Sequence, residues 1–138
     1  MRRLLPLLTL SIALCATTAL AAPPRACPGG LHRAVTAELY FGRDIRGVGE
    51  VSEADWTQFV DAEVTPRFPA GFTVLDGYGQ WRGQASGKIV AEPSTVVIVV
   101  AEPGETTLAA LAAIRADYQR RFAQESVGLA LADSCASF

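Results

Sequence analysis

The sequence predicts an α+β domain in which four strands and two helices follow one another as β-α-β-β-α-β. Three observations lead to this prediction. Residues 35–41 alternate between apolar and more polar side chains, as a half-buried strand does. Apolar residues recur at helical spacing in two later segments, 52–64 and 106–122. Between these segments lie two strand-like runs joined by a glycine-containing turn.

The first half of the domain is a strand, a glycine-punctuated loop and a helix. The strand is predicted over Val35–Phe41 and the loop over Gly42–Gly49. Ser52 can cap the first turn of the helix with its hydroxyl group. Pro66 ends that helix, because proline disfavours helical backbone in the residue before it. The apolar stripe that we expect this helix to bury consists of Trp56, Phe59, Val60 and Val64.

The second half begins with a predicted hairpin. Its first strand runs from Phe72 to Trp81 with interruptions at Gly77 and Gly79, and its turn spans residues 83–87. Its second strand runs from Lys88 to Val100. We expect a split at Glu92–Pro93, because proline cannot donate a ladder hydrogen bond.

A second helix and a last strand complete the predicted domain. Thr106 or Thr107 is the expected helix cap. A last short strand is expected within Leu129–Phe138 and is placed at Ser134–Phe138. The second helix is expected to bury Leu111, Ile114, Tyr118 and Phe122, with Leu108 adding to the stripe at its first turn.

Two right-handed crossovers joined by a hairpin make a ferredoxin-like sandwich, a four-stranded antiparallel sheet with both helices on one face. In this topology the end of the last strand lies beside the start of the first. Cys27 and Cys135 lie near those two places. We therefore expect a Cys27–Cys135 disulfide, as in an oxidising compartment; two unpaired buried thiols are the alternative.

The N-terminus has the three-part layout of a secretory leader: a basic start, an apolar run and small residues at the cleavage position. We predict a signal peptide at 1–21, a Pro/Gly-rich lead-in at 22–34 and a single α+β domain at 35–138. An uncleaved anchor is one alternative, although the apolar run is short for a bilayer. Lipid attachment at Cys15 is another, but Leu14 is bulky for it. We expect an exported protein, periplasmic or secreted, with no membrane span after cleavage.

Composition excludes several classes of function. The formal net charge is −2, so the chain lacks the basic surface of a nucleic-acid-binding protein. It has one histidine, His32, and the two cysteines outside the predicted leader, Cys27 and Cys135, are far apart in the sequence, so we expect no histidine/cysteine metal site and no cofactor. No pattern indicates a reaction class.

One group of residues is a candidate binding surface on the sheet face that the helices leave free. Tyr40, Gln80, Arg82 and Glu92 lie on the predicted strands, and Arg67 precedes the second strand. An arginine can hold a carboxylate with two hydrogen bonds, and a tyrosine adds apolar contact area. The alternative is purely structural: an Arg82–Glu92 cross-strand ion pair with aromatic residues packed on the sheet.

Five segments resemble a bacterial family catalogued as domain of unknown function 3574 (DUF3574). The resemblance covers about Val35 to Phe138 and implies a small protein, often exported or lipid-anchored, with no assigned activity and no catalytic residues to carry over. Leu14 departs from the lipid-anchored members. The segments are 36–42, 65–74, 79–82, 92–94 and 121–127.

Three functional hypotheses remain open. We favour a non-catalytic module whose free sheet face mediates binding or self-association, with a homodimer as one form. A pocket near Tyr40, Arg67, Gln80 and Arg82 could bind an unknown small ligand or catalyse a reaction, with Glu38 or Glu92 as the acid or base. The domain could also have only a structural role in the cell envelope.

Overall fold

The computed structural model describes residues 26–45, 47–84 and 86–138. The predicted signal peptide at 1–21 and the start of the lead-in lie outside the described residues. The predicted anchor and the lipid site at Cys15 lie outside them as well.

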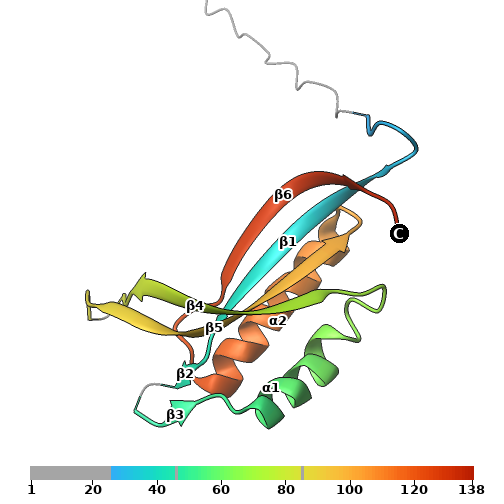
Figure 1. The fold of residues 1–138 in the computed structure, drawn as a ribbon. Coiled ribbons are helices and arrows are strands. Elements are labelled where there is room, and N and C mark those ends of the chain that lie inside the picture. Colours follow the sequence, from blue (N-terminus) through green and yellow to red (C-terminus); the bar gives the residue numbers. More distant parts are fainter. Residues whose placement is uncertain (1–25, 46, 85) are drawn as a thin grey trace, which may run out of the picture.

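Four of the described strands form one antiparallel sheet in the order β4-β5-β1-β6. Both helices lie against the same face of this sheet (Figure 1). The predicted α+β architecture of a four-stranded antiparallel sheet and two helices is therefore confirmed. The elements are β1 (His32–Gly42), β2 (Asp44–Ile45), β3 (Gly49–Glu50), α1 (Glu53–Phe59), the π-helical turn η1 (Val60–Val64), β4 (Thr73–Arg82), β5 (Ile89–Ala101), α2 (Glu105–Phe122) and β6 (Gly128–Ala136).

The core lies between the sheet and the helices. The strand alternation predicted for β1 is confirmed, because Ala37, Leu39 and Phe41 are fully buried. Five aromatic rings from β1 and the helices pack at centroid distances of 4.7–6.0 Å, mostly edge-on or tilted, with Trp56 and Phe59 stacked, arrangements that aromatic pairs favour. These rings belong to Phe41, Trp56, Phe59, Tyr118 and Phe122.

Two predicted strand boundaries were wrong. β1 begins at His32 rather than Val35, and β6 begins at Gly128 rather than Ser134. Both strands are longer because β6 pairs along its whole length with β1, from His32 opposite Ala136 to Tyr40 opposite Gly128. The alanine-rich sequence of β6 has a weak strand propensity, so tertiary pairing rather than local preference extends it.

The predicted interruptions within the hairpin were also wrong. β4 and β5 pair in unbroken register from Thr73 to Arg82, with Tyr78 opposite Pro93. β1 pairs with β5 only as far as Ser94, and the Pro93 carbonyl accepts a hydrogen bond from the Arg43 amide at 3.0 Å. Because the N and O atoms of a strand residue point to the same side, the missing N–H of Pro93 faces away from β4 and costs no bond in that ladder.

Of the two predicted helix caps, one is confirmed and one was wrong. Ser52 caps α1 as predicted, accepting a hydrogen bond from the Asp55 amide at 3.1 Å. The prediction for α2 was wrong: the helix begins at Glu105, so Thr106 and Thr107 lie inside its first turn. The predicted stripe of α2 is buried except for Leu108, which is 41% exposed.

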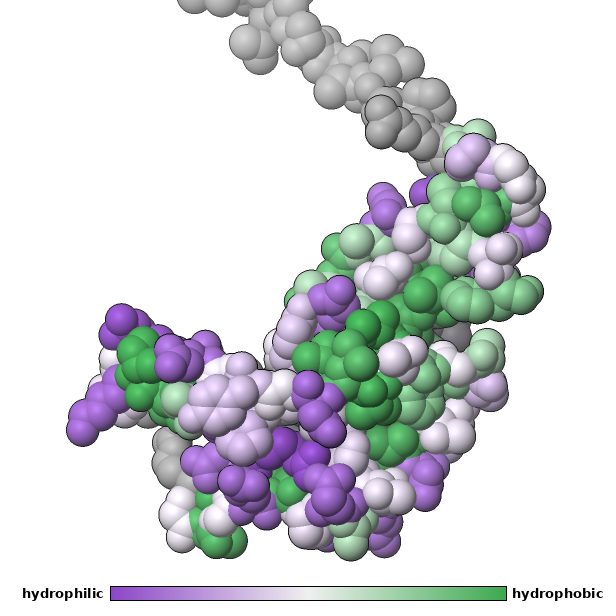
Figure 2. All heavy atoms as spheres, in the orientation of Figure 1, coloured by the Kyte–Doolittle hydropathy of each residue, from purple (hydrophilic) through white to green (hydrophobic). Residues whose placement is uncertain are grey.

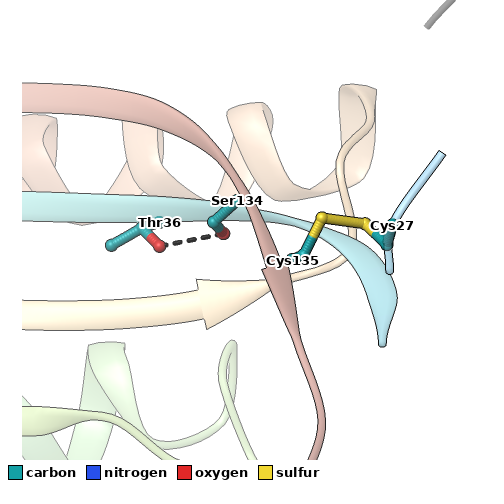
Figure 3. The surroundings of a disulfide bond; sticks show 4 residues. All are labelled: Cys27, Thr36, Ser134 and Cys135. Atoms are coloured by element: carbon teal, nitrogen blue, oxygen red, sulfur yellow. Dashed lines mark hydrogen bonds between the residues drawn. A yellow bond between two sulfur atoms is a disulfide. The ribbon is translucent and has the colours of Figure 1, made fainter. Parts of the chain in front are cut away.

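The Cys27–Cys135 disulfide is present, with the two Cα atoms 5.7 Å apart. It joins the residues before β1 to the end of β6 (Figure 3). Beside it, Thr36 donates a hydrogen bond to the Ser134 hydroxyl at 3.0 Å. This end of the β1–β6 pair is therefore fastened by a covalent bond as well as by the ladder.

Candidate functional site

At the other end of β1 the sheet carries a hollow of about 310 Å³, on the face that the helices leave free. We call it the Glu92 hollow. All four strands of the sheet and the segment after α2 contribute to it, so its shape depends on the register of the whole sheet. Its lining residues are Tyr40, Gly42, Gly79, Gln80, Trp81, Glu92, Ser94, Gln124, Ser126 and Gly128.

Glu92 is the buried charged group of this hollow, with 6% of its surface exposed. Its Oε1 atom accepts a hydrogen bond from the indole Nε1 of Trp81 at 2.5 Å. Its Oε2 atom accepts one from the backbone amide of Asp44 at 2.9 Å. No arginine, lysine or histidine in the described chain forms an ion pair with Glu92. Two uncharged donors therefore hold a buried carboxylate, an uncommon arrangement, since buried charges are usually paired.

Glycines make room for these side chains. A Cβ atom on Gly42 would lie 2.7 and 2.8 Å from the two carboxylate oxygens of Glu92. A Cβ atom on Gly128 would lie 3.1 Å from Cβ of Tyr40. At Gly79 the nearest atom is the Ser94 hydroxyl oxygen at 3.7 Å, an ordinary contact distance. Gly42 is thus required by Glu92, whereas Gly79 leaves space open.

Tyr40 forms one wall of the hollow. Its hydroxyl group donates a hydrogen bond to Glu38, the next residue on the same face of β1. This hydrogen bond to a carboxylate, together with slight desolvation, raises the pKa of Tyr40 above its usual value. The phenol is therefore protonated at neutral pH, and 43% of the residue is exposed.

The segment after α2 closes the opposite wall. Gln124 Nε2 donates a hydrogen bond to the Asp44 carbonyl at 2.7 Å. The Asp44 amide in turn donates to Glu92. The backbone of Asp44 thus connects the Glu92 carboxylate to the wall formed by Gln124 and Ser126.

Tyr118 supports the hollow from the core side. Its hydroxyl group donates a hydrogen bond to the Gly42 carbonyl at 2.8 Å. Burial, and to a smaller extent the charge of Glu92, raises the pKa of Tyr118 well above its usual value, against the opposing effect of Arg43. This tyrosine is a neutral hydrogen-bond donor that connects the aromatic core to the glycine beneath Glu92.

Three of the five residues proposed from the sequence as ligand-binding line this hollow: Tyr40, Gln80 and Glu92. The other two do not. Arg67 bonds to Glu63 at 2.6 Å and to Asp117 of α2 at 3.4 Å, so it fastens the segment after η1 to the second helix.

Arg82 forms neither the predicted ion pair nor part of the hollow. Its Nη1 atom donates to the Gly87 carbonyl at 2.6 Å, inside the hairpin. The register explains the difference, because Arg82 is opposite Ile89 and Glu92 is opposite Gly79. Residues 82 and 92 therefore lie on opposite faces of the sheet, and Trp81 takes the place expected for Arg82.

The sequence analysis did not identify Trp81, Gly42, Gly79, Ser94 and Gly128 as site residues. Gly79 and Trp81 are two residues apart, so both lie on the same face of the strand. A glycine beside a tryptophan on one face could have indicated open space next to an aromatic side chain. Glu92 could have been paired with that face only if the register of the hairpin had been known.

Other features of the surface are less organised. A shallow depression of about 650 Å³ follows the outer side chains of α1 and η1, such as Thr57 and Asp61. Within residues 26–45, 47–84 and 86–138, no three His, Cys, Asp or Glu side chains are grouped as metal ligands would be. Among the same residues, no helix has the length and apolar character needed to cross a membrane.

Comparison with known structures finds the same fold in a phage SAM lyase. In its complex with S-methyl-5'-thioadenosine that enzyme is 16% identical with a TM-score of 0.59, covering 75% of this chain and 90% of the enzyme. Its apo state is also 16% identical, with a TM-score of 0.56 and coverage of 83% and 92%. CutA from Synechococcus elongatus aligns at 15% identity over 76% of this chain and 80% of its own, with a TM-score of 0.48. At such identities the likeness to the lyase concerns the fold alone.

No curated protein matches the chain in sequence. A family description does match, over residues 36–138, which include both helices and all but the first residues of the sheet. The match confirms the resemblance seen in the sequence segments. The chain belongs to the family described as "Protein of unknown function (DUF3574)".

Proposed function

We propose that this protein is a binding domain that holds a small molecule in the Glu92 hollow. One observation supports the proposal most strongly: a buried carboxylate without a cationic partner among the described residues faces a hollow lined by two aromatic residues. Ligand sites are commonly concave and mostly apolar, with a few well-placed polar groups. A volume of about 310 Å³ is at the small end of the usual range of about 300–1,000 Å³.

The cost of this arrangement favours a functional role. A buried carboxylate held by neutral donors is less stable than an apolar side chain of similar size that packs well. In this protein, Gly42 and the indole of Trp81 are both arranged around Glu92. Gly42 and Trp81 thus accommodate an acidic side chain at position 92, where packing alone would favour an apolar one.

The test is a screen of small fragments by NMR with the folded, oxidised protein. We expect a subset of fragments to shift the indole N–H resonance of Trp81 and the amide resonance of Asp44, which donates to Glu92. The variant Gly79→Leu should abolish these shifts, because Gly79 is open to a side chain and the leucine would occupy the hollow. If fragments bind equally well to this variant, or if none shifts either resonance, the proposal is wrong.

The matched control is Tyr78→Leu. Tyr78 is the neighbour of Gly79 on the same edge strand, but it points to the other face and is 71% exposed. This variant also places a leucine on β4, outside the hollow. Fragment binding should be unchanged.

Self-association through the rest of the free face is the second candidate. Ile98 and Val96 lie on this face at the middle of the sheet, and Leu75 beside them is 49% exposed. Figure 2 shows hydrophobic surface gathered where β4 and β5 run. An apolar patch on both copies is what a symmetric dimer requires. Sedimentation of the protein and of Leu75→Glu tests this; a monomer at all micromolar concentrations contradicts it.

We also propose that the topology is ferredoxin-like and that the protein is exported and processed after residue 21. The strand order and the antiparallel neighbours support the first proposal. The disulfide supports the second, because such bonds persist in oxidising compartments. N-terminal sequencing of the protein from the extracytoplasmic fraction should begin at Ala22, and an intact Met1 would contradict this.

A further inference from the structure

We propose that the ligand of the Glu92 hollow is a small, flat organic cation that donates hydrogen bonds through its charged group, such as an amidinium, a guanidinium or a protonated aromatic amine. This inference rests on the proposed function and specifies the chemistry of that site. The charge of the lining, its aromatic residues and the free valences of its polar groups support it independently of one another.

The charge of the lining favours a cation. Among the described residues that line the hollow, Glu92 is the one acidic residue, and none is arginine, lysine or histidine. The arginines that the sequence suggested as clamps for a carboxylate are used elsewhere, Arg67 by Glu63 and Asp117, and Arg82 by Gly87. An anionic ligand would meet only the like charge of Glu92, whereas a cation would supply the partner that this buried group lacks among the described residues.

The valences of the carboxylate favour a cation with N–H groups. Each oxygen of Glu92 accepts one hydrogen bond from the protein. An ionised carboxylate has about four acceptor positions, so about two remain for a ligand. An amidinium or guanidinium presents two parallel N–H groups that match a carboxylate. A quaternary ammonium ion would supply charge but no hydrogen bond.

The walls favour a flat ligand. Tyr40 and Trp81 line the hollow from β1 and β4, the strands on either side of β5. Gly79, two residues before Trp81 on β4, presents backbone without a side chain on this face and leaves space open. A planar group can lie against such a glycine surface, and aromatic rings attract a cation close to their faces.

The experiment compares three compounds of the same shape and different charge: benzamidine, benzamide and benzoate. Binding to the folded, oxidised wild-type protein is measured by calorimetry and by the shift of the Trp81 indole resonance. We expect benzamidine to bind at least about tenfold more tightly than either of the others, as a charge-assisted pair does compared with a neutral one. The preference should weaken as salt is added.

Variants locate the effect. Glu92→Gln keeps the size of the side chain and removes its charge, so benzamidine should lose its advantage over benzamide. Glu102→Gln is the matched control, since Glu102 is an exposed carboxylate between β5 and α2 and does not line the hollow. Thermal unfolding of each variant establishes that it is folded. The comparison of the three compounds on the wild-type protein stands even if Glu92→Gln does not fold.

The outcomes separate this inference from the proposed function. If benzamide or benzoate binds as well as benzamidine and Gly79→Leu abolishes binding, the hollow is a ligand site but the cation assignment is wrong. If benzamidine does not bind at millimolar concentration, or binds equally to Glu92→Gln, the cation assignment is also wrong. Tight benzamidine binding that Glu92→Gln and Gly79→Leu both remove supports the two proposals together.

Discussion

The two ends of the β1–β6 strand pair differ sharply in how they are held. At one end the Cys27–Cys135 disulfide and the Thr36–Ser134 hydrogen bond join the strands through side chains. At the other end Tyr40 faces Gly128, and the neighbouring surface is hollow. The same pair of strands is therefore cross-linked by side chains at the end where Cys27 meets Cys135. At its other end it borders the Glu92 hollow, the site of our proposed ligand.

Removing the disulfide should have the largest effect on stability. The bond closes a loop with a sequence separation of 108 residues, and the loss of a native disulfide from a small domain typically costs about 2–5 kcal/mol. The variant Cys27→Ser/Cys135→Ser should lower the free energy of unfolding by this amount in urea denaturation. Reduction of the wild-type protein is the control and should give the same decrease.

A second measurement on that variant tests whether the Glu92 hollow is structurally independent of the disulfide. In conditions where it is folded, the indole resonance of Trp81 should keep its wild-type position. A large shift of that resonance would show that the fastened end and the hollow are coupled.

Gly42→Ala should have the next largest effect, at the open end. The new Cβ atom would lie 2.7 Å from a carboxylate oxygen of Glu92, so Glu92 must move away from its donors. We expect a loss of about 1–3 kcal/mol in the free energy of unfolding, as for other overpacked sites. Gly79→Ala is the control, because its Cβ atom would meet only an ordinary contact at 3.7 Å. Equal losses in both variants would contradict the role of Gly42.

Tyr118→Phe tests the bond that connects the core to the open end. The variant removes the hydrogen bond to the Gly42 carbonyl and should lower the free energy of unfolding by about 0.5–1.5 kcal/mol at neutral pH. Tyr78→Phe, at an exposed position, is the control and should stay within about 0.5 kcal/mol of the wild type.

The same tyrosine makes stability depend on alkaline pH. Its pKa is higher in the folded state than in the unfolded state, where it is about 10. The unfolded state therefore loses this proton first, so the contribution of Tyr118 is complete below pH about 10 and is lost progressively above it. Tyr118→Phe should show a shallower loss of stability between neutral and alkaline pH. An identical pH profile would contradict the burial of the hydroxyl group.

The smallest expected effect is at the surface of the hollow. Glu38→Gln removes the carboxylate that accepts the Tyr40 hydrogen bond, so the raised pKa of Tyr40 should return toward its usual value. NMR titration of the Tyr40 ring measures this, with Glu102→Gln as the control. An unchanged titration would show that the Tyr40–Glu38 bond does not persist in solution.

Local patterns predicted the elements and the core but not the site. The alternation of Val35–Phe41 and the spacing of Leu111, Ile114 and Tyr118 depend on neighbours within a few residues, so they were readable from the chain and the structure confirmed them. Ser52 and the Cys27–Cys135 pair were also identified correctly, the first from local capping and the second from the expected topology.

The errors concern properties that depend on strand register. Arg82 was assigned to the sheet face of Glu92 together with Gln80, because residues two apart on a strand point to the same face. That alternation does not say which face of the sheet they share. The unbroken β4–β5 ladder placed Gly79 and Trp81 on that face instead. A register shift of one residue moves every side chain of a strand to the other face of the sheet. The observed register therefore places Trp81, and not Arg82, at the site.

From its amino-acid order alone, the chain determined its periodic elements, its apolar core and the two thiols that would meet. These depend on spacing along the backbone and on a topology with few alternatives. Only the tertiary structure decided that Glu92 would pack against Gly42, accept a hydrogen bond from Trp81 and line one hollow with Tyr40. Residues that are tens of positions apart in sequence come together there because three strands pair in one particular register, and no local pattern specifies that register.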